Sequence, residues 1–407
     1  MEVLALILAG GKGSRLDLLS SRRSKPAMPF AGKYRIIDFT LSNCSQSGIY
    51  DIAILTQYLP LSLNEHIGSG KPWDLDRNNS SVVLLQPHSM WYEGTADAVL
   101  KNIKYLKSKN PRYVLILSGD HIYKMNYKKM LNFHKENNAG LTIATQEVSA
   151  DETNRFGMMS VDENNKIIKF EEKPLKTDAR LASMGIYIFN TNLLIDVLEK
   201  LNHDDLDFGK HVIPYLIKET KEKVFAHNFK GYWRDVGTYD SYLETNLEMN
   251  KPHLELDLYD PTWKIFTKSE ERPPVKVLNN ALIKDSLISN GSIIEGTVIN
   301  SVLSPGVRVG KGSYIENSVI MNDTIISNNV IIKNTVIDKR VVVGHNVEIG
   351  NTDDNTPNIS RPDLLSSGLT IIEKGTIIKA GAKIGKNCRI HRDANFDNLN
   401  IKSGSTI

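Results

Sequence analysis

The sequence has few cysteines, little net charge and no long hydrophobic segment, and each shortage argues against a class of protein. Its two cysteines, Cys44 and Cys388, lie far apart without metal-ligand spacing, which argues against a disulfide framework and for a reducing compartment. A net charge of +3 over 407 residues is too small to indicate a protein that binds nucleic acid or a membrane surface. No apolar run approaches the roughly 20 residues of a membrane span, and the N-terminus lacks an export signal. We therefore expect a cytoplasmic protein without a nucleic-acid or membrane partner.

A glycine-rich loop follows the first apolar run, residues 3–8, which is predicted to form a strand buried on both faces. The loop carries three glycines and two cations: Gly10, Gly11, Gly13, Lys12 and Arg15. Such glycines let backbone N–H groups turn toward an anion, which favours a nucleoside triphosphate. Leu16 stands where a dinucleotide-binding fingerprint needs glycine, and the ending of a Walker loop is missing. The glycines alone also fit an ordinary strand-to-helix turn.

Residues 1–250 alternate apolar strands with helical patterns, which predicts an α/β domain. Short buried strands are expected at 52–55, 114–117 and 141–144. A helix is expected to begin with Thr95 as its cap, with an apolar stripe of Val99, Leu100, Ile103 and Leu106. This alternation predicts a Rossmann-like, doubly wound, mostly parallel sheet. Ligands of such sheets bind at the carboxyl ends of the strands, where the glycine loop and Asp120 lie.

Beyond residue 277 apolar residues recur at every sixth position, with small or turn-forming residues between them. The runs are Leu282, Ile288 and Ile294; Leu303, Val309 and Ile315; Ile320, Ile326 and Ile332; Ile337, Val343 and Ile349; and, after a polar insertion, Ile372, Ile378, Ile384 and Ile390. This period predicts a left-handed parallel β-helix over 277–407, in which each side of a coil contributes one inward residue. β-Hairpins would show a period of two instead. Four prolines mark 251–276 as a linker between the domains.

Solenoids of this kind serve either acyl transfer or assembly, and the period alone does not choose between them. Acyltransferases of this shape usually need an exposed catalytic histidine, for which His345 and His391 are the candidates. A single histidine in a turn is more often simply solvated.

Four charged residues in the first 250 are candidates for chemistry. Asp120 follows an apolar strand and a Ser-Gly pair, where its carboxylate would suit Mg²⁺ bound together with phosphate oxygens. Asp235 is a candidate second ligand, although either aspartate also fits a turn or cap. Lys25 and Lys173 each precede a proline, which biases the lysine backbone toward extended geometry and can aim the side chain inward. Most lysines, however, are solvated surface groups.

Short motifs follow one another in order along almost the whole chain. They are 8–16 (LAGGKGSRL), 25–27 (KPA), 32–39 (GKYRIIDF), 41–44 (LSNC), 55–58 (LTQY), 91–98 (WYEGTADA), 118–125 (SGDHIYKM), 170–174 (FEEKP), 181–187 (LASMGIY), 207–210 (DFGK) and 232–238 (YWRDVGT). Together they resemble the glucose-1-phosphate adenylyltransferases of the bacterial glycogen pathway. Other sugar nucleotidyltransferases share the glycine loop and the Glu-Lys-Pro sequence, but not the full series. The resemblance implies that ATP and α-D-glucose 1-phosphate react, with Mg²⁺ as cofactor, to give ADP-glucose and pyrophosphate.

The resemblance also implies roles for individual residues. Arg15 and Lys25 would stabilise charge on the triphosphate, and Asp120 and Asp235 would hold the metal. The ATP site would comprise Gly10, Gly11, Gly13, Arg15, Gln57, Gly94 and Thr95. The glucose 1-phosphate site would comprise Tyr92, Gly157, Glu172, Lys173, Ser183, Tyr187 and Asp207. Arg22 and Arg23 fall where relatives often bind an anionic activator, although two solvated arginines in a loop fit equally well.

Three features depart from the family pattern. Asn126 replaces a common aspartate but can still cap a helix, Leu206 replaces the usual Ser-His before Asp207, and the region after Gly350 matches least well. Members of the family are tetrameric, and the sequence leaves open a homotetramer or a heterotetramer with a related subunit. The sequence also leaves open the kinetic rates and the identity of the effector, which is expected to be a sugar phosphate or a nucleotide.

Three alternatives to an active adenylyltransferase stay open. A non-catalytic regulatory subunit would typically have lost metal or loop charges, whereas this chain keeps Arg15, Lys25, Asp120, Lys173 and Asp235. A pyrophosphorylase for another nucleotide or sugar is disfavoured by segment 91–95, through the resemblance only. An acyltransferase would depend on His345 or His391.

Overall fold

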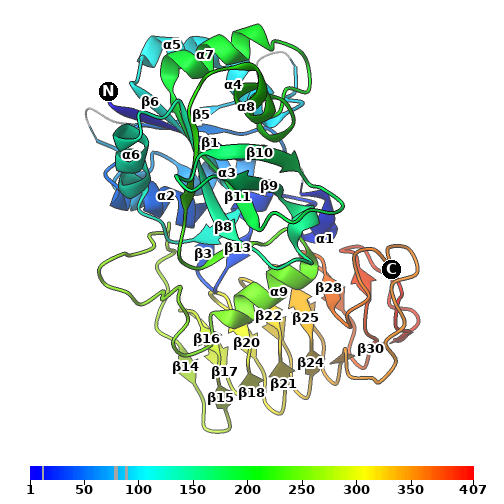
Figure 1. Ribbon diagram of the computed structural model, residues 1–407. Helices are drawn as coiled ribbons and strands as arrows, with labels where there is room; N and C mark the ends of the chain where they lie inside the picture. Colours follow the sequence, from blue (N-terminus) through cyan, green and yellow to red (C-terminus); the bar gives the residue numbers. More distant parts are fainter. Residues whose placement is uncertain (12, 78–80, 88–89) are drawn as a thin grey trace. The chain divides into compact units, whose positions relative to one another are not determined.

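The computed structural model describes residues 1–407 apart from 12, 78–80 and 88–89, so the predicted loop cation Lys12 lies outside the described residues (Figure 1). The chain divides into two compact units. The first unit comprises Met1–Gly11, Ile37–Trp233 and Asp260–Phe266, and the second comprises Lys12–Ile36, Arg234–Tyr259 and Thr267–Ile407. Within the described ranges, no helix is both long and apolar enough to cross a membrane.

A nine-stranded sheet forms the centre of the first unit, with the strand order β10-β9-β11-β6-β1-β4-β5 and with β8 joined to β11 and β12. The bounds are β1 Val3–Leu8, β4 Ile52–Leu55, β5 Val82–Leu85, β6 Tyr113–Ser118, β8 Leu141–Glu147, β9 Gly157–Val161, β10 Ile167–Glu172, β11 Leu181–Asn190 and β12 Val224–Asn228. The four predicted strands are confirmed as β1, β4, β6 and β8. β1 runs parallel to β4 and β6, whereas β11 runs antiparallel to β6 and β8. The sheet is therefore mixed.

The register of the parallel strands brings their carboxyl ends to one edge. Leu8 at the end of β1 lies opposite Leu55 on β4 and Ser118 on β6. The chain segments that follow these three strands, with Gly10, Gln57 and Asp120, therefore leave the sheet side by side, as predicted.

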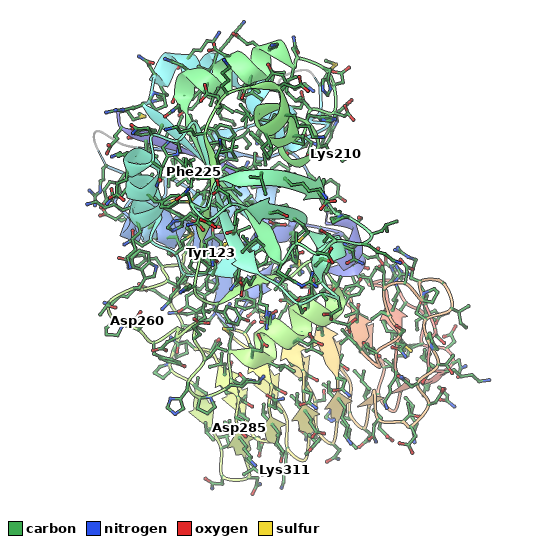
Figure 2. All side chains as sticks on the ribbon, viewed as in Figure 1. Tyr123, Lys210, Phe225, Asp260, Asp285 and Lys311 are labelled. Carbon is green, nitrogen blue, oxygen red and sulfur yellow. The ribbon has the colours of Figure 1, made fainter. Side chains whose placement is uncertain are left out.

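Seven helices of at least seven residues accompany this sheet in the described part of the first unit. They are α2 Ile36–Gln46, α3 Leu61–Ile67, α4 Thr95–Lys101, α5 Ile103–Lys109, α6 Tyr127–Glu136, α7 Thr191–Lys200 and α8 Ile213–Glu219. Asn126 accepts a hydrogen bond from the Lys128 N–H (3.0 Å) and caps α6, which confirms that prediction. Tyr123 and Phe225 are buried in this unit and Lys210 is exposed (Figure 2).

The helix predicted from Thr95 onward is interrupted. Gly94, and not Thr95, is its cap, and α4 ends before Asn102. The Asn102 side-chain amide donates hydrogen bonds to the Ala98 carbonyl (2.8 Å) and to the Tyr92 hydroxyl (3.0 Å). Such a side-chain bond competes with the helical backbone pattern and breaks the helix in two.

Three parallel sheets form a coil in the second unit, in which each strand pairs with the equivalent strand of the next turn (Figure 1). The first sheet contains β14 Lys276–Val277, β17 Ile293–Ile294, β20 Arg308–Val309, β23 Ile325–Ile326, β26 Val342–Val343 and β29 Ile377–Ile378. The second contains β15 Leu282–Lys284, β18 Thr297–Ile299, β21 Tyr314–Glu316, β24 Ile331–Lys333, β27 Glu348–Ile349, β30 Lys383–Ile384 and β32 Asn400–Ile401. The third contains β16 Leu287–Ile288, β19 Val302–Leu303, β22 Val319–Ile320, β25 Thr335–Ile337, β28 Thr370–Ile372 and β31 Arg389–Ile390. This three-sided parallel coil with its hexapeptide period is the predicted β-helix.

The predicted inward residues from Ile294 to Ile390 are buried in one core, but the prediction for Leu282 is wrong. Leu282 is 57% exposed, and its neighbour Ile283 packs against the core instead. In most turns of this β-helix, paired residues lie 17 residues apart, as Asn300 and Asn317 do, so one of the three steps between inward residues is shorter than six. The turn that begins at Leu282 is shorter still, because Leu282 pairs with Thr297, 15 residues further on. In that turn a short step separates the inward residues Ile283 and Ile288.

The polar insertion between β27 and β28 packs on the last coils through two buried asparagines. The Asn358 amide donates to the carbonyls of Asn387 (2.9 Å) and Ser405 (3.2 Å). The Asn387 amide in turn donates to the Thr356 carbonyl (3.1 Å). The divergent region after Gly350 therefore begins with an ordered strap over the coil. Asp285 and Lys311 lie in exposed turns of the same coil (Figure 2).

Two segments from outside the coil belong to the second unit. Residues 12–36 contain η1 Ser14–Leu16, α1 Asp17–Ser20, η2 Lys25–Ala27 and the antiparallel pair β2 Pro29–Phe30 and β3 Tyr34–Arg35. Residues 234–259 contain α9 Tyr239–Glu248, which begins at a capping box formed by Thr238 and Ser241. The domain boundaries expected at residues 250 and 277 stay predictions.

Candidate active site

Glu172 ends β10, and two glycines flank its carboxylate. A Cβ atom at Gly209 would stand 2.3 Å from Glu172 Oε2, and a Cβ atom at Gly157 would stand 2.9 Å from the same atom. Burial raises the pKa of Glu172; the Lys173 cation opposes this shift, and the Asp207 carboxylate adds to it. Three residues predicted at the sugar phosphate, Gly157, Glu172 and Asp207, therefore lie close together.

Asp207 caps the short π-helix η5 (Phe208–Val212) and also binds Thr95. Its Oδ1 atom accepts hydrogen bonds from the N–H groups of Gly209 (2.8 Å) and Lys210 (3.1 Å). Its Oδ2 atom accepts one from the Thr95 hydroxyl (2.8 Å). This bond joins a residue predicted at ATP to a residue predicted at the sugar.

Ser183 and Tyr187 lie on β11, at an irregularity in its pairing with β8. Their hydroxyl oxygens are 3.3 Å apart, and the Gly185 N–H donates to Ser183 Oγ (3.3 Å). Burial raises the pKa of the Tyr187 hydroxyl; Ser183 opposes this shift, and the Glu172 and Asp207 carboxylates add to it. These side chains form one polar cluster of carboxylates and hydroxyls inside the first unit.

Gln57 fixes the segment that leads into α4. Its amide nitrogen donates to the Tyr92 carbonyl (3.1 Å), and its amide oxygen accepts the Tyr92 N–H (2.5 Å). A Cβ atom at Gly10 would lie 3.1 Å from Gln57 Cβ. Gly10 and Gln57, both predicted at ATP, thus lie close to Tyr92, which is predicted at glucose 1-phosphate.

Gly94 is needed because the chain passes very close to Leu206. The Leu206 carbonyl accepts the N–H groups of Ala96 (3.0 Å) and Asp97 (2.8 Å), and a Cβ atom at Gly94 would stand 2.2 Å from that carbonyl oxygen. Gly94→Ala is therefore expected to destabilise the protein by about 1–3 kcal/mol through overpacking. Urea unfolding checks this, with Gly11→Ala as the control because, among the described residues other than its chain neighbours, none has an atom within 4 Å of the Cβ position of Gly11. Equal unfolding midpoints for the two variants would contradict the expected clash.

Neither of the two candidate lysines, Lys25 and Lys173, has the extended backbone predicted from the proline that follows it. Lys173 has a φ of 45° and donates its N–H to the Phe156 carbonyl (3.1 Å). Its side chain is 63% exposed, with Nζ 3.6 Å from Glu172. Lys25 is instead buried and begins the 3₁₀-helix η2. The preference that proline imposes on its predecessor is weak enough for tertiary contacts to override it.

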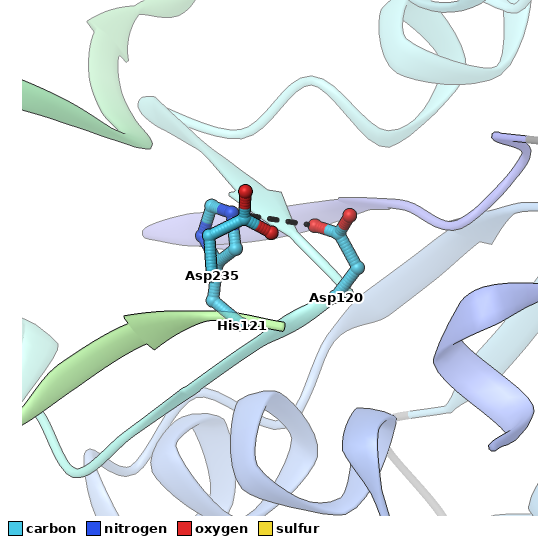
Figure 3. A group of neighbouring side chains, drawn as sticks. All are labelled: Asp120, His121 and Asp235. Carbon is cyan, nitrogen blue, oxygen red and sulfur yellow. Dashed lines mark ion pairs between the residues drawn. The ribbon is translucent and has the colours of Figure 1, made fainter. Parts of the chain in front are cut away.

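Asp120 lies in the short turn between β6 and β7 (His121–Tyr123), and its carboxylate forms an ion pair with His121 when the histidine is protonated (Figure 3). His121 Nε2 lies 3.6 Å from Asp120 Oδ1, and the Ser118 hydroxyl donates a hydrogen bond to the same carboxylate. The Asp120 side chain is 31% exposed. The His121 ring packs edge-on against the Trp233 indole, with centroids 5.3 Å apart. Asp120 is thus a partly exposed carboxylate with oxygen and nitrogen donors beside it.

In the second unit, Asp235 at the end of β13 (Trp233–Asp235) pairs with two predicted cations. Lys25 Nζ donates to Asp235 Oδ1 (2.7 Å), and both side chains are nearly buried. Arg15 Nη2 lies 3.9 Å from Asp235 Oδ2, and the Arg15 side chain is 56% exposed. A Cβ atom at Gly237 would stand 2.7 Å from Arg15 Nη2. The structure therefore brings Arg15, Lys25 and Asp235 together.

The two arginines predicted at an effector site contact carboxylates of the coil. Arg23 is buried and donates to the Asp338 carboxylate and to the Leu19 carbonyl (3.0 Å). Arg22 Nε lies 3.6 Å from Glu373. Burial and the neighbouring cations Arg35 and Arg23 lower the pKa of Lys339 to about 7. The basic side chains around Lys339 thus outnumber the acidic ones. Binding of an effector at Arg22 and Arg23 stays a prediction.

The two candidate acyltransferase histidines lie in the coil. His345 Nδ1 accepts the N–H of Asn328 (3.3 Å), and His391 Nδ1 lies 3.5 Å from Glu373. Both contacts are with the coil itself.

The sequence reasoning did not assign a role to His121, Gly209 or Gly237. His121 stands inside the 118–125 motif, but its contact with Trp233 depends on residues 112 positions apart. Gly209 and Gly237 stand inside the 207–210 and 232–238 motifs. Glycine within a short polar motif was the available signal, because it marks a close approach of another group.

Comparison with known proteins agrees with these motifs. Residues 4–251 match the family model described as nucleotidyl transferase, and residues 273–372 match the GlmU-like, C-terminal hexapeptide model. The chain is 45% identical over 417 residues to a glucose-1-phosphate adenylyltransferase of Acetivibrio thermocellus, with 100% of this chain and 97% of the relative covered. Identity to the enzyme of that name from Thermomicrobium roseum is 48% over 420 residues, with the same coverage, and to that of Clostridium acetobutylicum 51% over 322 residues, covering 77% and 84%. The chain belongs to the glucose-1-phosphate adenylyltransferase family.

Proposed function

We propose that this chain is a catalytically active enzyme that transfers the adenylyl group of ATP to α-D-glucose 1-phosphate for glycogen synthesis. The observation that carries the proposal is the nearly buried Lys25–Asp235 ion pair beside the exposed Arg15 guanidinium. Burying a charge pair is costly and gives little net stability, so its presence next to the glycine loop fits a site that must hold a polyanion.

The reaction needs no covalent enzyme intermediate. A phosphate oxygen of glucose 1-phosphate attacks the α-phosphorus of ATP in line, and the bond from that phosphorus to the β-phosphate oxygen breaks. Pyrophosphate leaves, and ADP-glucose remains. Catalysis of this kind rests on positioning and charge neutralisation. Arg15 and Lys25 are assigned to the charge on the triphosphate and the departing pyrophosphate.

Asp120 and Asp235 are assigned to a divalent cation, Mg²⁺. Their chemistry fits, because this ion prefers one or two carboxylates together with phosphate oxygens, and the Asp120 carboxylate is partly exposed. In the sequence, each aspartate also lies within two positions of a residue of the His121–Trp233 ring contact. Asp120 precedes His121, whose ring packs on Trp233, and Asp235 follows Trp233 by two positions. When bound, the cation neutralises negative charge on the phosphates.

The polar cluster of the first unit is assigned to the glucose moiety. Glu172, Ser183, Tyr187 and Asp207 present carboxylates and hydroxyls that can pair with sugar hydroxyls. A buried hydroxyl left unpaired costs about 1–3 kcal/mol, so such a cluster discriminates against sugars with a different pattern of hydroxyls. Gln57, Gly94 and Thr95 are assigned to the adenine side, where the Gln57–Tyr92 bonds support them.

A tetrameric assembly, of identical chains or with a related non-catalytic subunit, belongs to the same proposal. So does an anionic effector, a sugar phosphate or a nucleotide, at Arg22 and Arg23. The cation excess around Lys339 supports the effector. We also assign the enzyme to the cytoplasm.

Nucleotide selectivity tests the proposed function. Pyrophosphate release by the purified chain is measured with Mg²⁺ and glucose 1-phosphate while ATP is compared with UTP, GTP, CTP and dTTP. We expect release with ATP alone. Release with another nucleotide would overturn the substrate assignment and keep the mechanism. If no nucleotide gives pyrophosphate release, the hypothesis of a non-catalytic subunit would be favoured.

Lys173 provides a prediction for the sugar-phosphate side. Lys173→Met is expected to raise the KM for glucose 1-phosphate about 10- to 100-fold, because a hydrogen bond to a charged group contributes roughly 1.5–3 kcal/mol. The KM for ATP and the kcat should change little. Steady-state kinetics check this, with Lys169→Met as the control, since Lys169 is an equally exposed lysine on β10, the strand that ends just before Lys173. A change in the KM for ATP alone would contradict the assignment of Lys173 to glucose 1-phosphate.

A further inference from the structure

Asp17 stands two residues after Arg15, and its backbone conformation is strained. It directly follows η1, the 3₁₀-helix that contains Arg15, and has a φ of 27° and a ψ of −98°. Residues with side chains rarely adopt such positive φ values. A conformation of this kind persists only where the surrounding structure fixes it. Something outside η1 must therefore hold this turn in place.

The coil supplies the group that binds Asp17. Arg389, on β31, donates a hydrogen bond from its guanidinium to the Asp17 carboxylate. The two residues are 372 positions apart in sequence and belong to the same unit. Only 10% of the Arg389 side chain and 27% of the Asp17 side chain are exposed. The bond is thus shielded from water and from competing ions.

Arg389 is itself held rigidly. Its strand pairs with β28, where it lies opposite Ile371. Its N–H donates to the Ser405 carbonyl (2.9 Å), and its carbonyl accepts the N–H of Ile407 (3.0 Å). Pairing with β28 on one side and an isolated bridge to Thr406 on the other therefore fix the backbone from which the guanidinium extends.

Three further hydrogen bonds act on the same turn. The Leu18 N–H donates to the Tyr239 hydroxyl (2.9 Å), at the start of α9. The Ser20 hydroxyl donates to the carbonyls of Gly13 (3.0 Å) and Asp17 (3.2 Å). Arg15 lies inside this closed turn, whereas its own side chain is more than half exposed. The Arg15 backbone is therefore held in place by hydrogen bonds of the residues before and after it in the turn.

We propose that Arg389, a residue of the C-terminal coil, is a positioning residue for Arg15. By holding Asp17 it fixes the turn that directs the Arg15 guanidinium toward the triphosphate. This inference rests on the proposed function, which assigns Arg15 to the triphosphate. The coil thus contributes to catalysis as well as to assembly. Arg361 also interacts electrostatically with Asp17, but its guanidinium donates a hydrogen bond to Asp363. Arg389 is the arginine that donates a hydrogen bond to Asp17.

A double-mutant cycle tests the proposal. Arg389→Met is expected to lower kcat about tenfold or more, since a small misplacement of a catalytic group has effects of this size. Arg15→Ala should lower kcat further. In the Arg15→Ala background, Arg389→Met should then have no additional effect, because coupled residues are not additive. Arg392→Met is the matched control, since Arg392 is an exposed arginine of the same coil, and it should keep wild-type kcat.

A purely structural role for Arg389 would give a different pattern. The fold-loss in kcat from Arg389→Met would then be the same with and without Arg15, and this additivity would overturn the inference while leaving the role of Arg15 intact. Wild-type kcat in Arg15→Ala would overturn the role of Arg15 and the inference together. If Arg389→Met does not fold, the same cycle is run with Asp17→Asn, which keeps the shape of the side chain and removes its charge.

Discussion

Asp120→Asn is expected to lower turnover by about three orders of magnitude, because removal of one electrostatic group typically costs 10²–10³ in kcat and loss of the metal adds to this. The substitution keeps the shape of the side chain and an oxygen that can accept the hydrogen bond from Ser118. It removes the negative charge that a divalent cation needs in its ligand. The fold should therefore survive while the chemistry is lost.

Turnover of Asp120→Asn is measured by pyrophosphate release over a range of Mg²⁺ concentrations, together with its melting temperature. Asp178→Asn is the control, because Asp178 is an exposed aspartate between β10 and β11. Wild-type turnover of Asp120→Asn at ordinary Mg²⁺ would contradict the metal assignment. Recovery of turnover at high Mg²⁺ would support it, since the remaining ligands would bind the ion more weakly.

Lys25→Met is expected to lower both turnover and stability. The Lys25–Asp235 pair has side chains only 7% and 11% exposed, and removal of Lys25 leaves the nearly buried carboxylate with only the more distant Arg15. Breaking one partner of a buried pair costs about 3 kcal/mol. The loss of a cation assigned to the triphosphate should lower kcat by about 10²–10³.

These two effects are measured separately, by urea unfolding and by kcat at saturating substrates. Lys33→Met is the matched control, because Lys33 is an exposed lysine eight residues further along, and both quantities should stay at their wild-type values. Loss of stability with unchanged kcat in Lys25→Met would show that the lysine only balances Asp235. That result would remove Lys25 from the catalytic assignment.

The fold could be predicted largely from the sequence because its signals are local and periodic. The strands β1, β4, β6 and β8 are short apolar runs, and the six-residue period identified most inward positions of the coil. Errors arose where a single contact overrides the local pattern. Asn102 breaks a continuous apolar stripe through its side-chain bonds, and the shorter step before Ile288 shifts the first coil.

The charged contacts of the site could not be predicted in the same way. Lys25 and Asp235 are 210 positions apart, and Arg23 and Asp338 are 315 positions apart. Spacing along the chain carries no information about such pairs. Motifs identified the residues, and only the fold shows that Lys25 is nearly buried while Lys173 is exposed.

The central claim is that this chain by itself joins ATP to glucose 1-phosphate. The most direct test incubates the purified chain with Mg²⁺, ATP and glucose 1-phosphate labelled with oxygen-18 in its phosphate group, and analyses the products by mass spectrometry. We expect ADP-glucose that retains all of the label, and unlabelled pyrophosphate, because a sugar-phosphate oxygen attacks the α-phosphorus and the pyrophosphate comes from ATP alone. Absence of ADP-glucose, or label in the pyrophosphate, would contradict the account.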